Sequence, residues 1–190
     1  MYFRRKFDFR QWVLVTDWNP ITCYFYRECY GRFAATDYDV TDLGIWAHLS
    51  NNSIVKEYDG YKKDAEFTAA AGGGPETPPI HDYLMWSQQE FCQWLRAEYG
   101  TDEAWAGKIQ PAMKAVVRAT LRGATDMIKT RKSSVQLYGY DFMLDDSLNV
   151  WLLEINASPT MEASTPVTAR RGREKRASCG PWVLTLSSPR

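Results

Sequence analysis

The chain opens with two stretches in which apolar and polar side chains take turns, as they do in strands that are buried on one face. FDFRQWVLVT (residues 7–16) alternates throughout, and the aromatic run TCYFYRECYGRF (residues 22–33) follows it. Turn-forming residues at 17–20 separate the two runs. The pattern predicts an antiparallel β-hairpin.

Helical spacing takes over in the middle of the chain. Ser87 precedes an apolar-periodic run and Glu90 follows three residues later, which is a capping-box signature, and Gly100 supplies a stop. A second, longer helix is predicted over residues 102–129, where Pro111 indicates either a kink or a later start. Its apolar residues form one stripe at three-to-four spacing, which is typical of a helix face in the core. The stripe consists of Ile109, Met113, Val116, Val117, Leu121, Ala124 and Ile128.

Strand character returns after residue 129. QLYGYDFML (residues 136–144) and NVWLLEIN (residues 149–156) flank a polar turn at 145–147, so a second hairpin is predicted. Two hairpins with helices between them indicate an α+β fold built from antiparallel sheet hairpins and packed helices.

Two segments do not fit this pattern of strands and helices. Residues 66–80 are rich in Gly, Pro and Ala and lack a GK[ST] sequence, so they are interpreted as a flexible loop and not as a phosphate-binding loop. Residues 169–190 begin with a basic run and show no clear periodicity, which predicts a disordered tail. A polybasic patch for an acidic partner is the alternative for this tail.

Composition narrows the classes of site and partner. The 23 basic and 23 acidic residues cancel, so bulk charge indicates no partner, and we expect no nucleic acid. No apolar run is long enough for a membrane span, and no membrane partner is expected. The chain has two histidines and four cysteines, and the cysteines lack metal-type spacing, which argues against a zinc site or a His-based triad.

The second predicted hairpin carries a candidate cation site. Glu154 and Asn156 point to the same face because side chains alternate along a strand. If Leu144 pairs with Trp151, then Asp141 lies opposite Glu154. Two carboxylates and an amide oxygen on one face suit Mg²⁺, which usually comes with phosphates. The alternative is a solvated sheet face where water satisfies these polar groups.

The first predicted hairpin carries a second set of charges. Lys6, Asp8 and Arg10 are spaced by two and share one face, which Arg32 on the following strand is placed to join. Cations spaced in this way could hold phosphate oxygens, and a cross-strand charge cluster is the alternative. HLSNNSI (residues 48–54) is typical of turns or caps, with contact to a substrate as the less favoured reading.

Three of these stretches, in this order, resemble the tubulin tyrosine ligase-like family. They are RKFDFRQWVLV, HLSNNSI and LYGYDFMLDDSLNVWLLEINASPTM. The resemblance implies an ATP-grasp fold, in which two α+β lobes hold ATP between sheets. It also implies a reaction in which ATP phosphorylates a carboxylate on a tubulin tail and the amine of an amino acid attacks the acylphosphate. The products would be an amide bond, ADP and phosphate.

By motif match, the same resemblance implies roles for nine side chains. They are Asp141, Glu154 and Asn156 as Mg²⁺ ligands, Lys6 and Asp8 as ATP contacts, Arg10 and Arg32 as catalytic residues at the transferred phosphate, and Ser50 and Asn51 beside the substrate. Ser50 stands where many members carry Thr, and the hydroxyl is kept.

The resemblance is strongest to the glycine-adding branch of the family. KFDFRQWVLVTDWNP, HLSNNSI and EINASPTMEASTPVTA carry that similarity, so tubulin glycine ligase is the favoured activity and polyglutamylase the alternative. Such an enzyme would use free glycine and act in the cytoplasm, on the cytoskeleton of cilia and flagella.

Family members normally have several hundred residues before the point where this chain begins. We therefore interpret residues 1–168 as the C-terminal part of a catalytic domain and expect weak or absent ligase activity from this chain alone. A non-catalytic tubulin-binding module is the alternative from another class. A different enzyme on the same fold is the remaining hypothesis.

Overall fold

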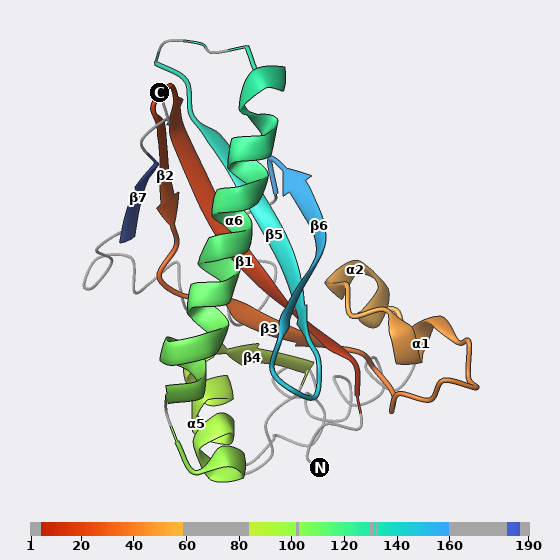
Figure 1. Cartoon of the computed structure of the whole chain (residues 1–190). Helices are drawn as coiled ribbons and strands as arrows, with labels where there is room; N and C mark the ends of the chain where they lie inside the picture. Colours follow the sequence, from red (N-terminus) through yellow and green to blue (C-terminus); the bar gives the residue numbers. More distant parts are fainter. Residues whose placement is uncertain are drawn as a thin grey trace, which may run out of the picture.

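The computed structural model describes residues 5–58, 84–101, 103–129, 131 and 133–159, together with the backbone of 182–186. The predicted flexible loop at 66–80 and most of the predicted tail at 169–190 lie outside the described residues. The described part is an antiparallel sheet packed against helices, which confirms the α+β class (Figure 1).

Within the described residues, seven strands form one sheet around the long strand β1. β2 and β3 pair with the two ends of one edge of β1, and β5 pairs with its other edge. β4 extends the sheet beyond β3, β7 beyond β2 and β6 beyond β5. The strands are β1 (Phe7–Trp18), β2 (Ile21–Phe25), β3 (Tyr30–Phe33), β4 (Met85–Ser87), β5 (Gln136–Leu144), β6 (Val150–Ala157) and β7 (Trp182–Leu186).

Both predicted hairpins are present, with one interruption. The run at 22–33 is split into β2 and β3, because the chain leaves the sheet at Tyr26–Cys29 and returns to the same edge of β1. β4 was not predicted, since three residues are too few to show a period. β7 differs from the expectation of a disordered tail, because the backbone of these five residues pairs with β2.

The helices lie on both sides of this sheet, and the longest crosses it in front of β1 and β5 (Figure 1). None of the helices in the described part of the chain is long and apolar enough to span a membrane. The helices are α1 (Ile45–His48), α2 (Asn52–Val55), α5 (Gln88–Tyr99) and α6 (Gln110–Ala124), with a π-helical segment at Ala104–Ile109 and a 3₁₀ turn at Thr125–Met127.

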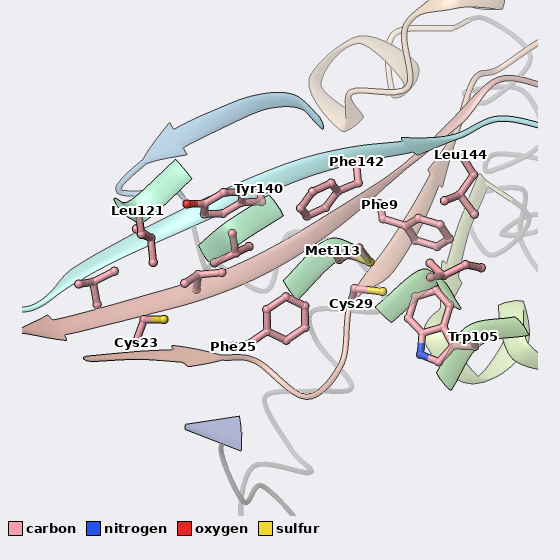
Figure 2. Packing of buried hydrophobic residues seen from close by; sticks show 14 of the residues in the cluster. Phe9, Cys23, Phe25, Cys29, Trp105, Met113, Leu121, Tyr140, Phe142 and Leu144 are labelled. Carbon is pink, nitrogen blue, oxygen red and sulfur yellow. The ribbon is translucent and has the colours of Figure 1, made fainter. Parts of the chain in front are cut away.

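The predicted apolar stripe packs α6 onto the sheet. Met113, Val117 and Leu121 are buried against the face of β1 and β5 that carries Phe9 and Phe142 (Figure 2). Pro111 is the second residue of α6, which continues without a break from the π-helical segment at Ala104–Ile109. The helical region predicted at 102–129 is therefore largely present, with α-helical geometry beginning at Gln110.

The capping box predicted before α5 is also present. The Ser87 hydroxyl accepts a hydrogen bond from the backbone N–H of Glu90, and the Glu90 carboxylate accepts one from the backbone N–H of Ser87 at 2.6 Å. At the other end Gly100 takes the left-handed conformation, with φ of 69°. Both ends of α5 are thus set by local sequence.

Replacing Ser87 with Ala is expected to lower the free energy of unfolding by about 1 kcal/mol, because the first turn of α5 loses its acceptor. Replacing Ser87 with Gly should cost only a few tenths of a kcal/mol, since glycine leaves that backbone accessible to water. Urea denaturation of the two variants measures the difference. Equal losses would show that the hydroxyl does not cap this helix.

Candidate functional site

A ladder of opposite charges, formed by Asp8, Arg10, Arg32 and Asp141, runs across three strands on the sheet face opposite α6. Asp8 of β1 lies directly across from Arg32 of β3, and Arg10 of β1 lies across from Asp141 of β5. Arg10 binds Asp141 with two hydrogen bonds, Nε to Oδ1 at 2.5 Å and Nη2 to Oδ2 at 2.9 Å. The alternation of β1 therefore places Asp8 and Arg10 on one face, as predicted from sequence.

Arg32 joins the two halves of this ladder. Its Nε donates to Asp8 Oδ1 at 2.6 Å, and its Nη2 lies 3.0 Å from Asp141 Oδ2. Ser50 closes the far side by donating its hydroxyl to the second oxygen of Asp8. Within this buried network every carboxylate oxygen of the two aspartates has a cation or a hydroxyl beside it, as buried charges require.

The network shifts the ionisation of its members. Burial would raise the pKa of Asp141, but the hydrogen bond from Arg10 and the charges of Arg32 and Arg10 outweigh it and hold the pKa below its usual value. Burial would likewise lower the pKa of the Arg32 guanidinium, and the carboxylates of Asp8 and Asp141 more than reverse this. Asp141 and Arg32 are therefore both charged at neutral pH.

The hairpin of β5 and β6 contains two registers joined by a bulge. Asp141 pairs with Glu154, which confirms that prediction, but Leu144 pairs with Val150 and not with Trp151. The register changes by one residue between Asp141 and Phe142, leaving Leu153 as the extra residue of β6. The uniform register expected from sequence was wrong because it contained no bulge.

The bulge is what allows Glu154 to face the charge ladder. Leu152 and Glu154 would share a face of a regular strand, yet Leu152 pairs with Phe142 and packs against the core. Glu154 pairs with Asp141 on the opposite face. Bulges commonly re-aim side chains in this way beside functional sites. Leu153 and Ile155 are 44% and 40% exposed, and no described strand pairs with the outer edge of β6.

The predicted metal-binding residues meet at this point. Asn156 donates from Nδ2 to Glu154 Oε1 at 2.8 Å and, at 3.4 Å, to Asp141 Oδ2. Its amide oxygen makes no hydrogen bond within the described residues. The donor set is two carboxylates and an amide oxygen, which fits Mg²⁺. The described residues contain no group of three or more His, Cys, Asp or Glu side chains arranged to hold a metal ion.

A cavity of about 480 Å³ opens beside these side chains. Arg10 and Arg32 form part of its wall, together with Glu154 and Asn156. Asp141 does not line it, because the two guanidinium groups lie over that carboxylate. The remaining lining residues are Tyr30, Asn51, Asn52, Ser53, Lys56, Met85, Ala157, Ser158 and Pro159.

The other predicted site residues divide between the cavity and its surroundings. Asn51 lines the cavity and also caps α2, where its side chain accepts from the backbone N–H of Ser53 at 3.1 Å. Ser50 is buried and Asp8 lies behind Arg32, so neither lines the cavity. Lys6, just before β1, is half-buried and also lies away from its lining.

Sequence reasoning missed Lys56. It follows α2 and lines the cavity, and within the described part of the chain its ammonium group has no hydrogen bond or ion pair. A single exposed lysine carries no spacing signal, so only the fold reveals that it faces Arg10 and Glu154 across the same cavity.

The chain is similar to a known protein family and to several of its members. A family profile described as the tubulin-tyrosine ligase family matches residues 1–172. The chain is 47% identical to tubulin monoglycylase TTLL3 of Danio rerio over 165 residues, which are 87% of this chain and 20% of that protein. It is 41% identical to tubulin glycylase 3C of Tetrahymena thermophila over 88% of this chain and 14% of that protein.

Protein monoglycylase TTLL8 of Mus musculus gives a similar result, with 42% identity over 87% of this chain and 18% of that protein. The chain thus spans a fifth or less of the length of these relatives.

Proposed function

The chain belongs to the tubulin-tyrosine ligase family, and from this premise we propose that it is part of an ATP-dependent ligase that attaches glycine to tubulin. The observation that carries the proposal is its identity of 41–47% to proteins named as glycylases over 87–88% of this chain. The antiparallel sheet with a charged cavity on one face is compatible with the ATP-grasp fold that the family resemblance implies.

In the proposed reaction, a carboxylate on a tubulin tail takes the terminal phosphoryl group of ATP and ADP leaves. The glycine amine then attacks the acylphosphate, phosphate leaves, and an amide bond remains. The transferred group is negatively charged throughout, so the site needs fixed cations more than a nucleophilic side chain. Arg10 and Arg32 meet this need, because their ion pairs with Asp141 and Asp8 hold both guanidinium groups at the cavity.

Mg²⁺ bound with ATP would neutralise charge on the phosphates. Glu154 and Asn156 would hold the ion at the cavity wall, and Asp141 would be its third protein ligand. Asp141 accepts two hydrogen bonds from Arg10, one on each carboxylate oxygen, and these bonds would hold the carboxylate in place for the ion.

Each remaining predicted site residue either contacts a substrate or holds another side chain in place. We propose that Lys6 contacts ATP directly, whereas Asp8 acts on the nucleotide by holding Arg32 in place. Asn51 would contact the acceptor, with Ser50 fixing Asp8 beneath it. Lys56 adds a cation to the cavity, which suits the carboxylates of an acidic tubulin tail.

Tubulin as the acceptor would place the protein on the cytoskeleton, and glycylation would place it on the microtubules of cilia and flagella. These locations rest on the activity of the relatives and carry over to this chain as part of the proposal.

The activity is tested by incubating the purified chain with tubulin, Mg·ATP and labelled glycine or labelled glutamate, with the Glu154→Gln variant as the blank. Any ATP-dependent incorporation above that blank is expected to be of glycine and to be weak, because the chain spans a fifth or less of the length of its relatives. Preferential incorporation of glutamate would favour a polyglutamylase. Absence of both, with retained tubulin co-sedimentation, would favour a non-catalytic tubulin-binding module.

A chimera makes the assay independent of the length of the chain. Residues 5–159 replace the matching region of the Danio rerio tubulin monoglycylase, to which the chain is 47% identical. Retained glycine incorporation is expected because the charge ladder and the donor set are then supplied by this chain. A chimera that folds and binds tubulin but transfers no glycine would contradict the proposed function.

A further inference from the structure

Gly139 of β5 lies on the site face, two residues before Asp141 and directly opposite Asn156 of β6. A Cβ atom added to Gly139 would lie 3.2 Å from Cδ of Arg10, 3.2 Å from its Nη1 and 3.1 Å from Cβ of Pro159. These separations are shorter than ordinary van der Waals contacts. Arg10 and Pro159 therefore occupy the space that any other side chain at this position would need.

Backbone conformation does not account for a glycine here. Among the glycines in the described residues, Gly100 is the one with a positive φ, so the backbone of Gly139 is open to any L-residue. Glycine inside a strand is unfavourable because it adds flexibility to the unfolded chain and has no side chain to pack. Close approach by another group is the usual physical reason to find one there.

We propose that Gly139 is the positioning residue for Arg10: its bare backbone lets the arginine lie across β5, reach Asp141 with two hydrogen bonds and stay at the cavity wall. The catalytic consequence rests on the proposed function, whereas the placement of Arg10 does not. Arg10 Nε and Nη2 bind Asp141 while Cδ and Nη1 lie over Gly139, so the guanidinium bridges the two positions.

Arg10, and not Pro159, is the group that a larger residue would displace. Pro159 follows Ser158, whose backbone has a φ of 53° and whose N–H donates to the carbonyl of Leu137 at 2.9 Å. The proline is therefore tethered to β5 by backbone contacts. Arg10 ends in a flexible side chain that can move away from an added atom, and any such movement is transmitted to its hydrogen bonds with Asp141.

The direct test is the solvent exchange of the Arg10 Nε–H, followed by NMR in the purified chain and assigned by its disappearance in Arg10→Lys. Gly139→Ala is expected to speed this exchange about tenfold, because the displaced guanidinium is held less tightly by the Asp141 carboxylate. Gly31→Ala is the matched control, since a Cβ on this strand glycine would meet ordinary contacts of 3.6–3.9 Å. Unchanged exchange in Gly139→Ala would overturn the proposal.

Binding of Mg·ATP, measured by calorimetry, extends the test to the site. Gly139→Ala should weaken binding about tenfold, which corresponds to the loss of one charge-assisted contact. Adding Gly139→Ala to Arg10→Ala should change the affinity less than twofold, because both changes remove the same contact. Additive effects would overturn the proposal. If the unaltered chain binds no Mg·ATP, the proposed function fails while the exchange measurement still decides the role of Gly139.

Folding of the variants gives a second readout. If Gly139→Ala alone does not fold, the double variant with Arg10→Ala is expected to fold, because the clash with the arginine is gone. Failure of both would show that the space belongs to Pro159 and would contradict the role assigned to Gly139.

Discussion

Replacing Glu154 with Gln is expected to weaken binding of Mg·ATP by about 100-fold, or about 3 kcal/mol, without loss of stability. Glutamine keeps the shape of the side chain and one oxygen, but it removes a charge from a donor set of two carboxylates and one amide. Mg²⁺ depends on such charged oxygen ligands. Calorimetric titration of the purified chain with Mg·ATP measures the effect.

The stability of the same variant separates a functional role from a structural one. Glu154 is exposed and directly opposite Asp141, and like charges in that position repel. Removing one of them should leave the free energy of unfolding unchanged or slightly raised. Glu98→Gln, an exposed acid on α5, is the control and should alter neither binding nor stability. A stability loss above about 1 kcal/mol would contradict a site role for Glu154, because exposed substitutions away from structural contacts rarely cost so much.

Alternation along strands made most of this site predictable. A period of two fixes which side chains share a face, so the grouping of Asp8 with Arg10, and of Glu154 with Asn156, needed no structure. The capping box of α5 and the stripe of α6 were predictable for a similar reason, since both depend on residues a few positions apart.

The parts of the site that the sequence did not predict depend on contacts between residues far apart in the chain. The bulge at Leu153 follows from the competition between burying Leu152 and exposing Glu154, which a single strand does not reveal. Met85 of β4 and Lys56 line the cavity although they are far from Arg10 and Glu154 in the sequence, so no local pattern reveals them. The sequence also could not show that Asp8 and Asp141 are both buried beneath Arg32, because burial depends on all the elements that surround the ladder.

Replacing Arg32 with Ala is expected to lower the free energy of unfolding by about 3–5 kcal/mol at pH 7. Arg32 is 6% exposed and lies between the carboxylates of Asp8 and Asp141, at 2.6 and 3.0 Å. Without it the two buried carboxylates lose the cation they share and keep Arg10, Ser50 and Asn156 as partners. Urea denaturation measures the loss. Arg122→Ala, an exposed arginine of α6, should stay within about 0.5 kcal/mol.

The pH dependence of that loss identifies its cause. Because the folded pKa of Asp141 is lowered, its ion pairs stabilise the unaltered chain above the unfolded pKa of about 3.9, and this stabilisation is lost as pH falls through the folded pKa. In Arg32→Ala the Asp141 carboxylate loses one of the two cations that lower its pKa, so its folded pKa rises and acid relieves part of the loss. The difference in stability between the two proteins should therefore shrink between pH 7 and about pH 4.5. A difference that stays constant over this range would mean that Arg32 stabilises the fold by packing its side chain and not by its charge.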